Sequence, residues 1–327
     1  MTTILVTGGA GYIGSHTCKV LDANGYTPVV YDNLSEGHKD FVKWGELVEG
    51  DVRDTAKLSK IIKQISPQAV IHFAASAYVG DSVKQPLRYY ENNLSGSLSL
   101  LQAMQNGACD KLIFSSTCAV YGEVDKLPIK IDQATKPINP YGRSKLMVEK
   151  AINDCAIANG VNSVALRYFN AAGADLDCQI GERHIPEPHI IPNVINAALH
   201  PCQEHVFELY GDDYGTADGT CVRDYIHVTD LANAHVLAVK YLEGHKGVFK
   251  FNLGAGQGTS IKQLISLVEK EVGPVVFKVQ PRRSGDPAVL YADTTTSKNE
   301  LGWEPIYSDM QTIISSAAKW AMKEINR

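Results

Sequence analysis

Tyr141 and Lys145 stand four residues apart, just after a pattern that is typical of a helix start. Asn139 is a residue type that caps helices, and Pro140 suits the first helical position. The spacing therefore places both side chains on one helix face. A tyrosine, with a pKa of about 10, acts as a base near neutral pH when roughly 4 kcal/mol of stabilisation favours its phenolate, and a desolvated ammonium nearby supplies part of this. Tyrosine and lysine at this spacing also occur as exposed packed pairs without catalytic function. The neighbouring motifs therefore decide between the catalytic and the structural interpretation.

Small hydroxyl side chains follow a strand that we expect over residues 111–115. Ser115, Ser116 and Thr117 would lie at the carboxyl end of a sheet, where open α/β folds bind ligands. We therefore expect Thr117 to share a hydrogen bond with a substrate hydroxyl that Tyr141 deprotonates. This favours a catalytic role for the tyrosine and lysine.

A glycine pattern near the N-terminus predicts a dinucleotide site. Gly8, Gly11 and Gly14 lie between an expected strand at 4–7 and an expected helix at 13–24. Such glycines allow a tight turn, close approach of a pyrophosphate to the backbone and close helix packing, with the helix N-terminus directed at the anion. Because no lysine follows Gly14, the pattern excludes a phosphate-loop NTPase.

Two aspartates at strand ends are candidate nucleoside ligands. Asp32 follows Gly14 by 18 residues and ends the second expected strand, where a carboxylate accepts hydrogen bonds from ribose hydroxyls and repels a 2′-phosphate. This predicts NAD rather than NADP, although Asp32-Asn33 is also typical of a simple strand-ending turn. We expect Asp51, after the third strand, to lie near the adenine edge.

The surrounding pattern predicts an α/β fold with a doubly wound parallel sheet, a Rossmann domain over 1–172. The expected strands are 4–7, 28–31, 46–49, 69–73, 111–115 and 163–167, and the expected helices are 13–24, 56–64, 86–107, 141–160, 227–243 and 261–272. A change to proline-rich, shorter segments predicts a smaller α+β domain over 173–327, mainly for substrate and interleaved with the first.

Composition narrows the functional classes. A net charge of −5, from 36 acidic and 31 basic residues, disfavours nucleic acid and acidic membranes as partners. We find no apolar run that approaches a membrane span and no leader before the first strand, so we expect a cytoplasmic protein. The seven cysteines are scattered, without a C-x-x-C pair or a histidine cluster at ligand spacing. We expect reduced thiols and no metal site.

These motifs resemble the extended short-chain dehydrogenase/reductase family, and in particular its members that epimerise UDP-sugars at carbon 4. The resemblance covers nearly the whole chain. It rests on the glycine motif at 7–14, the Asp-Asn pair at 32–33, Tyr-Tyr-Glu-Asn-Asn at 89–93, Tyr-Gly-Arg-Ser-Lys-Leu-Met-Val-Glu at 141–149 and Arg-Tyr-Phe-Asn at 167–170. It also rests on the segments 219–231, 252–254 and 281–286.

The resemblance implies a role for each matching residue. Tyr141 is implied as the general base, Lys145 as the ligand of the nicotinamide ribose that lowers the pKa of Tyr141, and Thr117 as the group that orients the sugar hydroxyl. The implied NAD-binding residues are Gly8, Gly11, Tyr12, Ile13, Gly14, Asp32, Asn33, Asp51, Val52, Phe73, Ala74, Asn92, Tyr141, Lys145, Tyr168 and Phe169. Besides Thr117 and Tyr141, the implied UDP-sugar-binding residues are Asn170, His189, Ile190, Tyr210, Arg223, Arg283, Asp286 and Leu290. Ala77 departs from the family, because many members have a lysine there.

The activity that the resemblance implies is reversible 4-epimerisation of UDP-galactose and UDP-glucose through a 4-keto sugar and NADH. Leu290 occupies the position that limits the size of the sugar, so UDP-xylose, UDP-arabinose and UDP-N-acetylglucosamine stay open as substrates. Cys118-Ala119 replaces the Asp-Glu pair that related dehydratases use, which disfavours dehydration. A non-catalytic NAD-binding protein is expected to lose Thr117, Tyr141 and Lys145. The family also implies a homodimer through segments 86–107 and 141–160.

Overall fold

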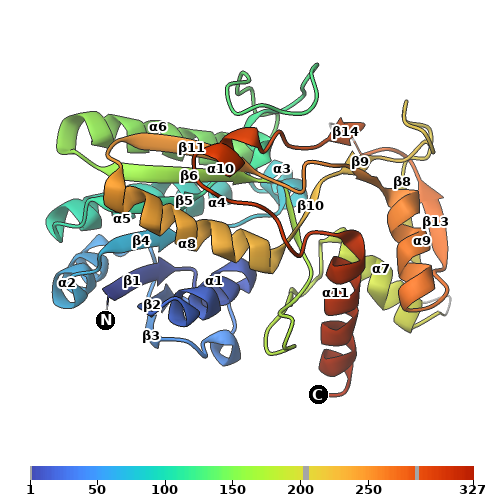
Figure 1. Ribbon diagram of the computed structural model, residues 1–327, viewed down its shortest axis with the longest axis horizontal. Coiled ribbons are helices and arrows are strands. Elements are labelled where there is room, and N and C mark those ends of the chain that lie inside the picture. The colour runs from blue at the N-terminus through green and yellow to red at the C-terminus, as the bar shows by residue number, and fades with distance from the viewer. Residues whose placement is uncertain (1, 202–205, 284–286) are drawn as a thin grey trace.

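Seven parallel strands form the main sheet in the order β3-β2-β1-β4-β5-β6-β11 (Figure 1). The structure, a computed structural model, describes residues 2–201, 206–283 and 287–327. The strands are β1 (Thr2–Thr7), β2 (Tyr26–Asp32), β3 (Glu46–Glu49), β4 (Ala69–His72), β5 (Lys111–Ser115), β6 (Asn162–Tyr168) and β11 (Val248–Leu253). The strand order reverses between β1 and β4, so the expected doubly wound fold is confirmed. Its ligand crevice belongs at the carboxyl ends of these strands.

Both faces of the sheet are buried because apolar residues occupy consecutive strand positions. In β1, Ile4 and Val6 pack into one core, while Leu5 packs into the core on the opposite face. In β5, Ile113 and Leu112 divide in the same way. This is the alternation of a strand that is covered on two sides by helices.

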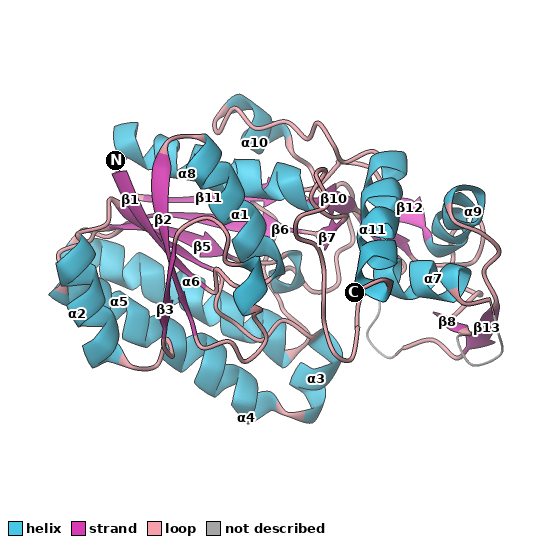
Figure 2. Ribbon diagram, turned by 90° about the horizontal axis from the view of Figure 1, so that it is seen from below, coloured by secondary structure: helices cyan, strands magenta, loops and turns pink. Residues whose placement is uncertain are grey.

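Helices cover the two faces of the sheet unequally. Figure 2 shows α1 and α8 on one side and α2, α5 and α6 on the other. The helices of this lobe are α1 (Tyr12–Ala23), α2 (Thr55–Ile65), α3 (Val79–Lys84), α4 (Pro86–Tyr89), α5 (Gly96–Asn106), α6 (Pro140–Asn159), α8 (Val228–Gly244) and α10 (Thr295–Asn299), with the short helices η1 (Lys39–Phe41), η2 (Tyr90–Ser95) and η3 (Cys118–Val120). The single helix expected over 86–107 is divided, because the π-helical segment η2 separates α4 from α5.

The seventh strand comes from the second half of the chain. Helix α8 packs beside α1, and β11 then pairs in parallel with β6. The sequence predicted the helix over 227–243 but not the strand that follows it. Residues beyond 173 therefore contribute to both lobes.

The smaller lobe packs three helices and short strands around a second apolar core. Its core includes Ile191 and Val194, Leu264 and Val268, and Ile313. Its elements are β7 (Asn170–Ala172), α7 (Ile190–Leu199), β8 (Phe207–Tyr210), β9 (Val222–Arg223), β10 (Tyr225–His227), β12 (Thr259–Ser260), α9 (Ile261–Glu271), β13 (Phe277–Gln280), β14 (Val289–Leu290) and α11 (Met310–Ile325).

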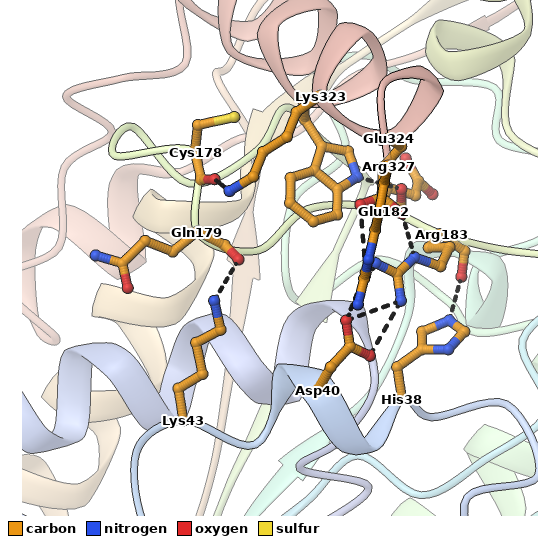
Figure 3. A network of polar contacts seen from close by, with 11 residues as sticks. His38, Asp40, Lys43, Cys178, Gln179, Glu182, Arg183, Lys323, Glu324 and Arg327 are labelled. Atoms are coloured by element: carbon orange, nitrogen blue, oxygen red, sulfur yellow. Dashed lines mark hydrogen bonds and ion pairs between the residues drawn. The ribbon is translucent and has the colours of Figure 1, made fainter.

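An ion-pair network fastens the loop before α7 to both lobes (Figure 3). The Arg183 Nη1 atom lies 3.1 Å from Asp40 Oδ1, and Arg183 Nε lies 2.5 Å from Glu324 Oε2 on α11. Arg327 also pairs with Asp40, at 2.7 Å, and Trp320 Nε1 donates to the Glu182 carbonyl oxygen at 2.9 Å. The C-terminal helix thus holds this loop against η1. Among the described helices, none has the length and apolar character to span a bilayer.

Candidate active site

Helix α6 begins at the residues that the sequence indicated. The Asn139 Oδ1 atom accepts a hydrogen bond from the Gly142 backbone N–H at 2.8 Å, and Pro140 is the first helical residue. A Cβ atom at Gly142 would lie 2.5 Å from the Ala119 carbonyl oxygen. Glycine therefore lets the first turn of α6 approach η3 closely, which brings Tyr141 to the loop after β5.

Tyr141 and Lys145 reach the end of β5 from successive turns of α6. Lys145 Nζ donates to the Ser115 carbonyl oxygen at 2.7 Å and lies 4.9 Å from the centre of the Phe114 ring. The Thr117 side chain lies close enough to the Tyr141 hydroxyl to lower the pKa of that phenol. All three candidate catalytic side chains are buried. The structure thus brings Tyr141, Lys145 and Thr117 together.

Burial shifts the pKa values of Tyr141 and Lys145 in opposite directions. Desolvation raises the pKa of Tyr141 far above 10, with only the Thr117 side chain opposing it. Desolvation also lowers the pKa of Lys145 to about 7. Both shifts favour the neutral forms. A Tyr141 phenolate therefore needs further positive charge at the site, beyond what Lys145 supplies by itself.

A third turn of α6 extends the same contact through Glu149, which sequence reasoning missed. Glu149 Oε1 accepts from Ser116 Oγ at 2.6 Å and from Arg167 Nε at 2.9 Å, and its Oε2 accepts from Arg167 Nη2 at 2.6 Å. Glu149 and Arg167 are 2 % and 3 % exposed. The signal in the sequence is the position of Glu149, two helical turns after Tyr141 on the same face.

The Glu149–Arg167 pair belongs to a network that joins α6 to two strands. Arg167 Nη1 donates to the Tyr121 hydroxyl at 3.1 Å, and that hydroxyl donates to Asn252 Oδ1 on β11 at 2.7 Å. Asn252 Nδ2 donates to the Ile129 carbonyl oxygen at 2.9 Å. The neighbouring carboxylate and phenol raise the pKa of Arg167 above its ordinary value despite its burial. The network joins α6, β6 and β11 behind the Tyr141 trio.

The glycine loop closes tightly at the carboxyl end of β1. A Cβ atom at Gly14 would lie 2.2 Å from the Gly8 carbonyl oxygen, and one at Gly8 would lie 2.5 Å from the Ala74 nitrogen. Gly8 also has a φ of +74°, which favours glycine. Gly11 stands at the N-cap of α1 without a side-chain cap. The loop therefore packs closely while it leaves the N-terminus of α1 open to an anion.

The two candidate nucleoside aspartates each have protein partners. Asp32 Oδ2 accepts from the Ala10 backbone N–H at 3.0 Å, so this buried carboxylate also shapes the glycine loop. Burial raises the pKa of Asp32. Asp51 accepts from Asn33 Nδ2 at 3.1 Å and pairs with Arg53 at 2.7 Å, and this side-chain bond to Arg53 holds the pKa of Asp51 far below its usual range.

Asn93 is a further residue that sequence reasoning missed. Its Oδ1 accepts from the Ser76 backbone N–H at 2.8 Å, and its Nδ2 donates to the Ser76 carbonyl oxygen at 2.9 Å and to Ser144 Oγ on α6 at 3.2 Å. The neighbouring Asn92 Nδ2 donates to Ser76 Oγ at 3.3 Å. Asn93 thus ties the loop after β4 to α6. The doubled asparagine was its signal in the sequence.

The remaining candidate cofactor residues lie around the same strand ends. Phe73 follows β4, and its ring centre lies 4.6 Å from that of the buried His235 on α8. The Tyr168 hydroxyl shares a 2.6 Å hydrogen bond with Ser115 Oγ. The buried residues of this set are Tyr12, Val52 and Phe169, and those of intermediate exposure are Ile13 and Ala74.

A cavity of about 290 Å³ in the smaller lobe brings two candidate substrate residues together. Tyr210 and Arg283 both line it, and the Arg283 guanidinium carbon lies 3.8 Å from the centre of the Tyr210 ring. Asn193 and Asn196 from α7 line the opposite part. An aromatic ring, a guanidinium and amide groups are suited to a base and its attached phosphates.

Arg223 and Leu290 lie side by side on β9 and β14, which pair in parallel with these two residues in register. Asn170 Nδ2 donates to the Asp224 carbonyl oxygen at 2.8 Å. Leu290 is partly buried against a cluster that includes Phe169. These three candidates therefore come from strands near the end of β6.

Two other substrate candidates lie at the start of α7. His189 is its N-cap residue and Ile190 its first residue, and His189 Nδ1 lies 2.6 Å from Glu182 Oε1. His189 thus belongs to a histidine–glutamate cluster that sequence analysis did not anticipate. Asp286 lies outside the described residues.

NAD fits the first part of this site on structural grounds. The clash distances at Gly8 and Gly14 show a loop that tolerates no side chain at these positions, and the open α1 N-terminus can receive a pyrophosphate. Asp32 ends β2 beside this loop, where a carboxylate that binds the ribose hydroxyls is expected.

A doubly wound sheet with a glycine loop at its switch point and a buried tyrosine–lysine pair beside it defines a dinucleotide-binding enzyme. The chain belongs to the NAD dependent epimerase/dehydratase family, whose sequence pattern matches residues 4–254. It is 51% identical to a UDP-glucose 4-epimerase of Rhizobium meliloti, with 97% of this chain and 96% of that protein aligned.

Solved structures of relatives superimpose closely. The UDP-glucose 4-epimerase of Brucella ovis in complex with NAD has a TM-score of 0.94 and 52% identity, and the match covers 97% of this chain and 98% of that one. A UDP-glucose-4-epimerase of Stenotrophomonas maltophila with bound NAD and formylated UDP-arabinopyranose has a TM-score of 0.95 and 38% identity, over 100% and 99% of the two chains.

We predict that the Glu149–Arg167 pair positions α6 for catalysis. Glu149→Gln leaves Arg167 buried without its ionic partner, so it should lower the free energy of unfolding by about 3–5 kcal/mol and also lower kcat. The double variant Glu149→Gln/Arg167→Met removes the unpaired charge and should regain much of the stability. Denaturant unfolding and steady-state kinetics measure both effects.

The double variant separates positioning from simple stability. If the pair fixes the register of α6, the double variant regains stability but its kcat stays low, while its KM changes little. Recovery of wild-type kcat together with stability would contradict a positioning role.

Proposed function

We propose that the protein catalyses the reversible 4-epimerisation of UDP-galactose and UDP-glucose with NAD as cofactor. The observation that carries the proposal is the buried group of Tyr141, Lys145 and Thr117 beside the glycine loop, in a chain that is similar over nearly its whole length to UDP-glucose 4-epimerases. The reaction inverts one carbon of the sugar and leaves the rest of the substrate unchanged.

Tyr141 acts as the base that removes the proton from the hydroxyl on carbon 4. It returns the proton after the sugar has rotated to present its other face. Thr117 orients that hydroxyl through its contact with Tyr141. NAD, when bound, supplies the acceptor for the hydride that leaves carbon 4, and the positive charge of its oxidised ring. Lys145 adds a second positive charge and the two together favour the phenolate over the neutral phenol.

The smaller lobe holds the nucleotide while the sugar reorients. Tyr210 and Arg283 bind the uridine diphosphate in the 290 Å³ cavity, and Arg223 engages the phosphates. Asn170, His189, Ile190 and Leu290 complete the substrate-binding set, and Leu290 limits the space for the sugar. Firm binding of the nucleotide with a looser hold on the hexose permits both faces of carbon 4 to be presented.

We also propose that the protein is a homodimer that works in the cytoplasm. Large apolar side chains are exposed on neighbouring helices: Leu87 on α4 is 80% exposed, Leu98 on α5 45% and Met147 on α6 43%. These are the segments through which the family resemblance implies a dimer. The described cysteines are unpaired, which suits a reducing compartment.

Light scattering tests the dimer. We expect a particle of twice the 35.6 kDa chain mass, and a shift toward monomer when Leu87→Asp places a charge in the interface. A wild-type protein with the mass of one chain would reject this assembly.

Tyr141→Phe tests the assigned base. Removal of the hydroxyl should lower turnover of UDP-galactose by at least about 10²-fold, because the phenolate has no substitute at this position. Bound NAD, measured after denaturation, and the unfolding transition should stay close to wild type, since the ring still fills its place.

Tyr26→Phe is the matched control, because Tyr26 begins β2 at the amino ends of the strands, away from the site at their carboxyl ends, and its hydroxyl meets Glu243 at 3.4 Å. This control should retain full turnover. Unchanged turnover in Tyr141→Phe would overturn the role of Tyr141.

A further inference from the structure

Four potential metal ligands gather in the loop between β7 and α7. Glu182, His184, Glu187 and His189 each present one ligand atom, and these atoms all lie within 4.8 Å of one another. His189 is also a candidate substrate residue, while the other three belong neither to the Tyr141 trio nor to the glycine loop nor to the substrate-binding set. All four come from a span of eight residues, so the loop conformation alone assembles the cluster.

Three of the distances within the cluster are close to the edge of a four-coordinate metal site, with Glu187 contributing a different oxygen to each of its two contacts. Tetrahedral bonds of about 2.0–2.1 Å separate ligand atoms by about 3.3–3.4 Å. His189 Nδ1 lies 3.3 Å from Glu187 Oε1, and His184 Nδ1 lies 3.5 Å from both Glu187 Oε2 and Glu182 Oε1. The 2.6 Å approach of His189 Nδ1 to Glu182 Oε1 is shorter than a tetrahedral edge, and the four ligand atoms lie within 4.8 Å of one another, so a bound ion would shift these side chains into register.

A second observation concerns the hydrogen bonding of these atoms. Glu182 Oε1, His184 Nδ1 and His189 Nδ1 are buried and have no partner with hydrogen-bond geometry. The Glu182 side chain is only 5% exposed. Three buried polar atoms that point at one another without aligned hydrogen bonds are what a site shaped for a cation presents.

The surroundings hold the cluster in place without supplying a competing cation. Arg183 directs its guanidinium away, to Asp40 and Glu324 (Figure 3), and the Glu182 carbonyl oxygen accepts from Trp320 Nε1. The Tyr78 ring lies edge-on to both imidazoles, with ring centres 5.7 Å from that of His184 and 6.0 Å from that of His189. The loop is thus fixed from both sides.

We propose that Glu182, His184, Glu187 and His189 bind one divalent transition-metal ion per chain, with Zn²⁺ as the preferred ion. Two imidazole nitrogens and two carboxylate oxygens form a ligand set that suits Zn²⁺, and the two carboxylates balance its charge. The ion is structural: it fixes His189, the N-cap of α7, and so the helix whose Asn193 and Asn196 line the nucleotide cavity.

The competing account is an ion-pair network of protonated histidines. The neighbouring carboxylates raise the pKa of His184 to about 9 and that of His189 to about 10, against the effect of burial. Protons then occupy the place that the proposal gives to the metal. Direct measurement of metal binding distinguishes the two accounts, and it does not depend on catalytic activity or on the proposed reaction.

The test uses the full chain without a purification tag, treated with a chelator and then titrated with Zn²⁺ in a calorimeter, with elemental analysis after gel filtration. We expect one Zn²⁺ per chain. His184→Asn and Glu187→Gln should each weaken binding at least about tenfold. His245→Asn is the matched control, because His245 follows α8, is exposed and stacks on Tyr241; its binding should equal wild type.

Cobalt gives a second readout on the unmodified protein, which matters if a variant folds poorly. Co²⁺ in a four-coordinate site absorbs visible light strongly, and Zn²⁺ should displace it in a one-to-one ratio. Absence of stoichiometric Zn²⁺ binding, a weak six-coordinate Co²⁺ spectrum, or equal affinity in His184→Asn and His245→Asn would overturn the metal site and leave the ion-pair network.

Discussion

Helix α6 is held against the end of β5 by three consecutive turns, and the rest of the site depends on that contact. Tyr141 meets Thr117, Lys145 meets the Ser115 carbonyl oxygen, and Glu149 meets Ser116. Residues spaced by four on a helix thus contact consecutive residues of one strand end. A helix displaced by one turn would replace Tyr141 with another residue, so the proposed chemistry requires this single register.

This arrangement buries ionisable side chains, which is unfavourable unless each charge is compensated. Lys145 is buried next to an aromatic ring, and its pKa of about 7 shows how strongly the site disfavours its charged form. Glu149 is compensated by Arg167, whose Nη1 group also donates to the Tyr121 hydroxyl. The same packing that excludes water raises the pKa of Tyr141, so the proposed role of this tyrosine as the base requires a cationic cofactor ring in its pocket.

Local patterns predicted the sheet and the central site, while long-range contacts escaped prediction. Some signals act over only a few residues and can therefore be recognised in the sequence. They are the alternating apolar residues, the Asn139 cap and the spacing of Gly8, Gly11 and Gly14. The pairing of β11 with β6, the Glu149–Arg167 pair and the role of Asn93 join distant segments. The 182–189 cluster is local in sequence, but its form depends on the loop that α11 and η1 hold.

In the proposed reaction a hydride leaves carbon 4 and returns to the same carbon on the opposite face, without exchange with water. The most direct test is to incubate the purified protein, without added cofactor, with UDP-galactose deuterated at carbon 4 in ordinary water and to follow the sugar by NMR. The account predicts UDP-glucose that retains the deuterium at carbon 4. Product with hydrogen from water at carbon 4, or no conversion even after NAD is supplied, would contradict it.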